Sequence, residues 1–434
     1  MKKLALKNAL IIDPSQKINA IGTIIIDNKV ISDLIIKKNI QLDKENYNII
    51  DCVGLILCPG FVDIKCHLRV PGAEHKENLS YASQSAAAAG ITSLVCMPNT
   101  DPITDNISMV ELIQRKARKE SDVKIFSTAS ITKKLLGKDL TEFGLLKEAG
   151  AVGFTDAIKA VDDATVMLRA LKYASAFDTL LMQHPEEKSL AKGGSMNSSL
   201  LSTKLGISGI PEEAEVIQVD RDLRLTEMTN GRIHFFNITT ALALKSIEEA
   251  KIRGVKVSCS TSPHYFNLTE DDIRKWRTYA KVSPPLRNKK NVESVIKGIL
   301  ENTIDCISSD HSPHDTDSKR LPFEQASSGI IGFESLLPLT MQLITTNKLS
   351  LNRLVELLSY NPSNILNLKT GNLKKLSPAD LVVIDHKKRI KLSSSLVKSK
   401  SNNFPYENNN GLGKVMLTMV DGKIIHNARN FNIK

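Results

Sequence analysis

Three polar side chains of different chemistry share one face of an apolar segment in this sequence. The segment starts at Pro59 and leads into the run Asp63-Ile64-Lys65-Cys66-His67-Leu68-Arg69. Side chains two positions apart in a strand face the same side, so residues 63, 65 and 67 share a face and Cys66 points away. An imidazole can bind a metal ion, whereas an ammonium has no lone pair and its charge opposes a divalent cation. His67 therefore favours metal chemistry on this face, and Lys65 argues against it.

The elements that must position these side chains form a β/α repeat. A Pro-Gly turn, an alanine-rich helical stretch and a second apolar strand at 92–96 follow the first strand, which predicts a βαβ unit. Strands and helices continue to alternate through residues 59–365. We therefore expect a TIM-type (β/α)8 barrel there, with its chemically informative residues at the C-terminal ends of the strands.

Both ends of the chain are β-rich instead. Short apolar runs separated by turns occupy residues 4–12, 22–26 and 29–36, with a hairpin at 27–29, and similar runs recur at 379–385, 415–420 and 421–425. The two ends predict one small β-sandwich built from residues 1–58 and 366–434, which makes the whole an α/β protein.

Composition excludes several classes of protein. Of 434 residues, 41% are hydrophobic and 24% charged, which is ordinary for a globular protein with a large core. No apolar run approaches the roughly 18 residues of a membrane span, and the first residues favour a strand over a signal peptide. The six cysteines show no CxxC pairing, so we expect free thiols, a cytoplasmic location and no membrane contact.

The net charge of +11 raises the question of a nucleic-acid partner. The lysines are scattered, and aromatic residues do not alternate with them as a base-stacking surface requires. We therefore predict no nucleic-acid binding, and we interpret the basic run at 387–391 as a solvated loop.

Five further motifs follow the opening run along the chain. They are Met97-Pro98-Asn99-Thr100, the run at 206–215, Pro284-Pro285-Leu286-Arg287, Asp310-His311-Ser312-Pro313-His314 and Gly329-Ile330-Ile331-Gly332. In type, order and spacing, these motifs resemble the dihydroorotases, cyclic amidohydrolases of pyrimidine synthesis. The resemblance runs almost end to end. It implies a barrel with a composite β-sandwich.

The resemblance also implies a zinc centre that acidifies a water and polarises an amide, with an aspartate as proton shuttle. Three of the family's six ligand positions are retained, at His67, His184 and Asp310, of which Asp310 is the shuttle. The other three hold Lys65, Ala157 and Asn237. Asp156 is retained beside Ala157, but its side chain should point elsewhere in an extended segment.

The retained ligands are divided between the two metals by family analogy, with His67 and Asp310 on the first and His184 on the second. Neither set reaches the three protein ligands that zinc needs. We therefore predict that zinc is weakly bound or absent. The alternatives are a misaligned loop position and a weak single-metal site.

The substrate side of the family pattern is better preserved. Arg69 and Asn99 match positions that grip the substrate carboxylate, and His314 matches another contact. An arginine fork suits a carboxylate, so dihydroorotate or carbamoyl aspartate could still bind. Ser283 replaces a family asparagine, and Arg69 could instead form an ion pair at the barrel rim.

Three functional hypotheses follow. The first is a member with a degenerate metal site, which resembles the non-catalytic dihydroorotase-like chains that assemble with aspartate carbamoyltransferase. It would be an oligomer with a structural role in pyrimidine biosynthesis. The second is an active dihydroorotase with an impoverished site, and the third is an unrelated anion-binding module around Arg69.

Charge accounting gives one structural expectation. Without a divalent ion, a buried Asp310 would lack a positive partner, at a cost of several kcal/mol. Lys65 faces the same interior, and its four-carbon stem can carry the ammonium to about the metal position. We predict an ion pair of roughly 4 Å or less between Lys65 and Asp310.

Overall fold

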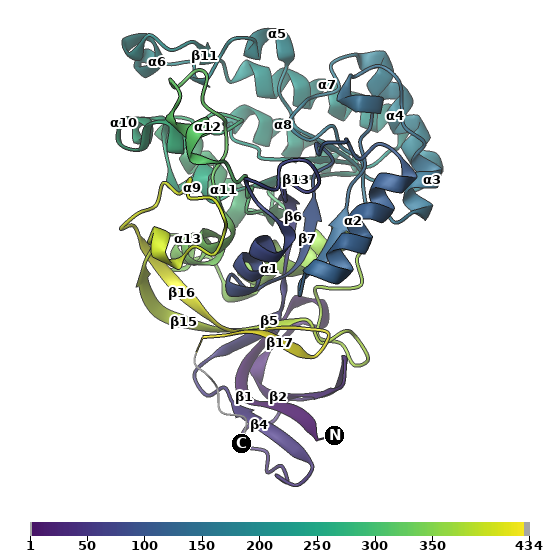
Figure 1. Ribbon diagram of the computed structural model, residues 1–434, viewed down its shortest axis with the longest axis vertical. Coiled ribbons are helices and arrows are strands. Elements are labelled where there is room, and N and C mark those ends of the chain that lie inside the picture. Colours follow the sequence, from purple (N-terminus) through teal and green to yellow (C-terminus); the bar gives the residue numbers. More distant parts are fainter. Residues whose placement is uncertain (1, 429–434) are drawn as a thin grey trace.

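The computed structural model describes residues 2–428 (Figure 1). The outermost residues of the predicted sandwich ranges, 1 and 429–434, lie outside the described part. The barrel occupies the upper part of the view and a β-rich layer its lower part. Within residues 2–428, no helix combines the length and the apolar character that crossing a membrane requires.

The barrel is a closed ring of parallel segments. One sheet joins β6 (Phe61–Cys66), β7 (Ile91–Cys96) and β8 (Lys124–Ser127), and another joins β9 (Leu181–Gln183), β12 (Ile233–Phe235), β13 (Val257–Thr261) and β14 (Cys306–Ile307). Phe154 bridges the two sheets by pairing with Ala129 and Leu181. The pairing of Cys66 with His311 closes the ring. The predicted (β/α)8 barrel is confirmed.

Helices cover the outside of this ring. Seven long ones are α1 (Leu79–Ala88), α2 (Ile107–Glu120), α4 (Ala164–Ala176), α7 (Glu213–Thr229), α8 (Ala241–Ile252), α11 (Lys289–Leu300) and α13 (Phe333–Thr346). The largest apolar cluster joins their inner faces to the strands. Asparagine side chains cap several of them: Asn106, for example, accepts a hydrogen bond from the Met109 amide.

Shorter elements fill the connections between these helices and strands. They are α3 (Phe143–Glu148), α5 (Lys188–Ala191), β10 (Met196–Asn197), α6 (Leu200–Leu205), β11 (Gly209–Ile210), α9 (His264–Asn267), α10 (Ile273–Trp276), α12 (Thr316–Arg320), α14 (Leu351–Val355) and α15 (Asn361–Ile365).

The two ends of the chain form one sheet of eight strands. Its members are β1 (Lys3–Asp13), β2 (Ile18–Asp27), β3 (Val30–Ile35), β4 (Tyr47–Asp51), β5 (Ile56–Pro59), β15 (Leu381–Lys391), β16 (Asn410–Val420) and β17 (Lys423–Asn427). Strand β5 pairs with both β1 and β15, and so joins the N-terminal strands to the C-terminal ones. Both groups share one apolar cluster, which confirms the predicted composite β-sandwich. The limits at 58/59 and 365/366 stay predictions.

The basic run at 387–391 is not a loop, so this prediction was wrong. Strand β15 continues through it, and Arg389, Ile390 and Lys391 pair with residues of β16. The charged side chains are exposed on the strand, so the run is solvated although it is extended.

The chain leaves the sheet between β15 and β16 and crosses to the barrel. We call residues 393–409 the strap; it is part of the yellow segment beside α9 and α13 in Figure 1. Phe404 and Tyr406 of the strap share an apolar cluster with Tyr265 and Ile330 of the barrel. The strap is thus fastened to the barrel by buried aromatic side chains.

Candidate functional site

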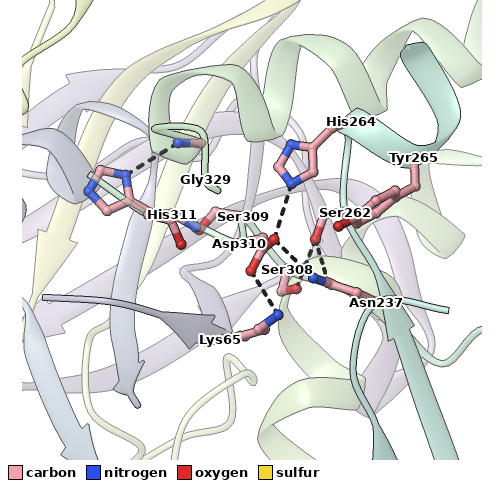
Figure 2. Close-up of polar contacts among 12 residues, drawn as sticks. Lys65, Asn237, Ser262, His264, Tyr265, Ser308, Ser309, Asp310, His311 and Gly329 are labelled. Carbon is pink, nitrogen blue, oxygen red and sulfur yellow. Dashed lines mark hydrogen bonds and ion pairs between the residues drawn. The ribbon is translucent and has the colours of Figure 1, made fainter. Parts of the chain in front are cut away.

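A buried ion pair lies at the C-terminal ends of the barrel strands. Lys65 Nζ, from β6, is 2.9 Å from Asp310 Oδ1, and the two side chains are only 1% and 7% exposed. The two residues meet because the pairing of Cys66 with His311 brings their segments together. Figure 2 shows the ammonium directed at the carboxylate. The predicted ion pair is confirmed.

The other oxygen of Asp310 has partners of its own. Asn237 Nδ2 donates to Oδ2 at 2.9 Å, and His264 Nε2 lies 3.4 Å from the same oxygen (Figure 2). Asn237 is itself held by Ser262, whose Oγ donates to the amide oxygen at 2.9 Å. Both oxygens of Asp310 are therefore engaged by side-chain donors.

These contacts fix the charge of Asp310. Burial alone would raise its pKa, but the Lys65 ammonium and the His264 ring outweigh burial and hold the pKa well below its usual range. The carboxylate is therefore ionised throughout the physiological range.

The arrangement does not fit zinc. Zinc in proteins takes at least three good ligands, yet within residues 2–428 no three His, Cys, Asp or Glu side chains are placed to hold a metal ion. Of the groups around Asp310, Lys65 brings a positive charge and Asn237 presents its amide N–H. Both groups are donors where a metal would need acceptors.

The two retained histidines are buried and neutral. His67 Nδ1 lies 3.0 Å from Asn99 Oδ1, and His184 Nε2 lies 3.3 Å from Ser283 Oγ. Burial lowers the pKa of each ring to about 3, and the nearby Lys65 ammonium adds to the effect. Each is thus an uncharged neighbour of the ion pair.

The replaced family ligand position at Ala157 has an unusual backbone conformation. Ala157 has φ +59°, a left-handed conformation that asparagine and aspartate tolerate better than alanine. Asp156 points away as expected, because its carboxylate accepts hydrogen bonds from Ile131 and Thr132. No carboxylate therefore reaches the ion pair from this segment.

The predicted substrate residues do meet. A hollow of about 330 Å³ lies over the ion pair, and its lining includes Lys65, His67, Arg69, Asn99, Asp310 and His314. Arg69 donates through Nε to the Pro313 carbonyl at 3.0 Å. Within residues 2–428 Arg69 has no ion pair with a carboxylate, so the expected alternative of a rim ion pair is not found. Burial lowers the pKa of Arg69 to about 10, which leaves it charged.

Comparisons with known proteins agree with this architecture. The family model described as dihydro-orotase-like matches residues 54–242. The dihydroorotase of Acetivibrio thermocellus is 40% identical over 423 residues, which cover 97% of this chain and 98% of the relative. That of Syntrophus aciditrophicus is 39% identical over 424 residues, covering 98% and 99%. The chain belongs to the dihydroorotase family.

Solved structures support the fold of this family member. The L-hydantoinase (dihydropyrimidinase) of Arthrobacter aurescens superposes with a TM-score of 0.87 at 22% identity, covering 100% of this chain and 98% of that one. The dihydropyrimidinase of Brevibacillus agri gives 0.84 at 19% identity, covering 99% and 96%. At this level of identity the likeness shows the fold alone.

Sequence reasoning missed part of the site in this dihydroorotase-family chain. His264 was visible as one member of a Ser-Pro-His run directly after β13, at a strand end where a barrel places its chemistry. Nothing in the sequence pointed to Tyr406, whose hydroxyl lies 3.4 Å from His264 Nδ1. His234, in contrast, forms hydrogen bonds with Ser258 and Ser260 of β13.

A double-mutant cycle measures how strongly the ion pair is coupled. We expect Asp310→Asn to lower the free energy of unfolding by about 3–5 kcal/mol, because it leaves the Lys65 ammonium buried without a counter-charge. Adding Lys65→Met should recover most of that loss in urea unfolding. The exposed pair of Lys3 and Asp27, 3.1 Å apart, is the matched control. Its coupling should stay below about 1 kcal/mol, and equal coupling in the two pairs would show that burial does not strengthen the Lys65–Asp310 pair.

The buried neutral histidines predict acid sensitivity. Burial lowers the pKa of His234 to about 3, as it does for His67 and His184, while an unfolded histidine titrates near ~6.5. Between about pH 3 and pH 6.5 the unfolded chain therefore binds more protons than the folded chain. Stability is complete above pH 6.5 and is lost as the pH falls, by about 1.4 kcal/mol per pH unit for each histidine.

Urea unfolding from pH 7 to pH 5 checks this expectation. His234→Gln should make the slope of the unfolding free energy against pH shallower, because one proton fewer is taken up on unfolding. His75→Gln, at an exposed position, should leave the slope unchanged. Identical slopes for the two variants would show that His234 does not titrate as described.

Proposed function

We propose that this dihydroorotase-family chain has no zinc-dependent turnover and has a structural role in pyrimidine biosynthesis. The observation that carries the proposal is the distance of 2.9 Å between Lys65 Nζ and Asp310 Oδ1. By family resemblance Asp310 is the proton shuttle, and a shuttle must be free to accept and return a proton. Here its pKa is far too low for that exchange near neutral pH.

The same hollow is proposed to keep its affinity for a small carboxylate. Lys65 and Arg69 bring two positive charges to the lining and Asp310 brings one negative charge, so the balance favours an anion. Arg69, Asn99 and His314 lie together there, as the family's carboxylate grip requires. Dihydroorotate and carbamoyl aspartate are the candidate ligands.

The proposed partner is aspartate carbamoyltransferase, and the proposed state is an oligomer in the cytoplasm. The support is the resemblance to non-catalytic dihydroorotase-like chains that assemble with this transferase. In such a complex the chain would contribute surface rather than chemistry, which is compatible with a charge pair at its centre.

An active dihydroorotase is the second candidate. The support is the retention of His67, His184 and Asp310, together with about 40% identity to proteins named dihydroorotase. Catalysis would then require Lys65 to leave Asp310 when substrate or metal binds.

Metal content separates these candidates. We expect the purified protein to carry well under one zinc per chain by mass spectrometry and to show no dihydroorotate hydrolysis. The variant Lys65→His/Ala157→Asp/Asn237→His should take up zinc, because it restores the family's ligands at all three replaced positions. Stoichiometric zinc in the unmodified protein, with turnover lost in Asp310→Ala, would overturn the proposal.

Size-exclusion chromatography tests the partner. A mixture with purified aspartate carbamoyltransferase should elute earlier than either protein alone, since stable interfaces of this kind are large and apolar. The transferase should also lose stability or assembly when the chain is withheld. An unrelated protein of similar mass serves as the control. Unshifted peaks in the mixture would reject this partner.

A further inference from the structure

The strap makes a buried polar contact with the wall of the hollow. Asn403 is completely buried, and its Nδ2 donates to two carbonyl oxygens, those of Ser312 at 2.9 Å and Gly329 at 3.0 Å. Its Oδ1 accepts a hydrogen bond from the His314 amide at 3.1 Å. One amide side chain thus ties together two backbone segments that are 15 or more residues apart in sequence.

These two segments are the ends of one loop, residues 313–329. Four residues of this loop line the hollow, together with Ser312, which directly precedes the loop. The four are His314, Ser327, Ser328 and Gly329. The ends approach very closely: a Cβ at Gly329, where φ is +146°, would lie 2.6 Å from Ser312 Cβ. Asn403 therefore closes the base of the loop that forms one wall of the hollow.

The strap makes a second contact through Tyr406. A carboxylate only accepts hydrogen bonds, so His264 Nε2 must carry the proton that faces Asp310. In the neutral ring the remaining nitrogen, Nδ1, is then an acceptor, and the Tyr406 hydroxyl lies 3.4 Å from it. Tyr406 is fully buried, and its hydroxyl favours the tautomer in which His264 donates to Asp310.

A third contact joins the strap to the residue next to Asp310. The Ser399 hydroxyl donates to the buried Glu77 carboxylate, which lies 3.6 Å from His311 Nε2. The strap therefore reaches the site from three directions: the loop at 313–329, His264 and Glu77.

We propose that Asn403 and Tyr406 are positioning residues of the hollow. Asn403 holds the loop wall that carries His314, and Tyr406 holds the His264 ring with its Nε2 directed at Asp310. Their effect on ligand affinity rests on the proposed function, but their effects on the loop and on the ring do not.

Hydrogen exchange in the free protein tests the role of Asn403. Asn403→Asp removes both N–H donors and sets a carboxylate against two carbonyl oxygens, so we expect amides of residues 313–329 to exchange at least tenfold faster. Strands β6–β8 should be unchanged. Asn402→Asp, at the exposed neighbouring position, is the matched control and should exchange like the unmodified protein. Unchanged exchange of the loop in Asn403→Asp would overturn the proposal for this residue.

Tyr406→Phe removes only one hydroxyl and tests the second residue. In nitrogen-15 spectra of the histidine rings, the Nδ1 resonance of His264 should shift in the variant, because this nitrogen loses its hydrogen-bond partner, while Nε2 keeps the proton that faces Asp310. An unchanged ring spectrum would overturn the role of Tyr406. If Asn403→Asp does not fold, Tyr406→Phe still tests whether the strap positions residues of the site, because a shifted ring spectrum would show that the strap contacts His264.

Calorimetric titration with dihydroorotate separates ligand binding by the hollow from positioning by the strap. We expect each variant to bind at least about tenfold more weakly than the unmodified protein, and Asn402→Asp to bind equally well. No binding by the unmodified protein would reject the carboxylate pocket of the proposed function, and the exchange and ring spectra would still decide the strap. Unchanged affinity in both variants would overturn the positioning role of Asn403 and Tyr406 and would leave the proposed carboxylate pocket intact.

Discussion

A carboxylate buried at the centre of a barrel needs a compensating charge, and most of this site is arranged around that requirement. Taking an ion out of water costs several kcal/mol unless charge and hydrogen bonds replace the lost solvation. Lys65 supplies the charge to Asp310, and Asn237 and His264 supply further hydrogen bonds to its second oxygen. The pair is possible only because the barrel closes where it does, between Cys66 and His311.

The charge pair also explains the state of its neighbours. A second cation, Arg69, lines the same hollow, and within residues 2–428 it forms no ion pair with a carboxylate. Burial lowers the pKa of His67 and His184, and the nearby Lys65 ammonium lowers each further, so both rings stay neutral. The charge of Asp310 is therefore balanced by Lys65, while the Arg69 guanidinium leaves the outer part of the hollow positive.

The fold was predictable from strand and helix patterns, whereas the ion pair was predictable because the resemblance to dihydroorotases places Lys65 and Asp310 at ligand positions of the metal centre. Strand alternation placed Lys65 inward, and its flanking residues Asp63, His67 and Arg69 fixed its register. The roles of Asn237 and His264 were not predictable, because they depend on which strand ends adjoin Asp310. The role of Tyr406 was even less predictable, since this residue comes from a segment that was assigned to the β-sandwich. The run at 387–391 was misjudged because its charges favour a loop, whereas backbone pairing with β16 determines its conformation.

The central position of β5 constrains the order in which the molecule can assemble. One edge of β5 pairs with β1, close in sequence, but the other pairs with β15, which the ribosome supplies only after the entire barrel. Until then β5 is an edge strand with free hydrogen-bonding groups, the kind of surface on which nascent chains associate wrongly. The strap, between β15 and β16, emerges later still. The mouth of the barrel is thus completed only after β15, and the sheet only after β16 and β17, so a prematurely terminated chain would lack a finished sheet and, if it ended before the strap, a finished pocket.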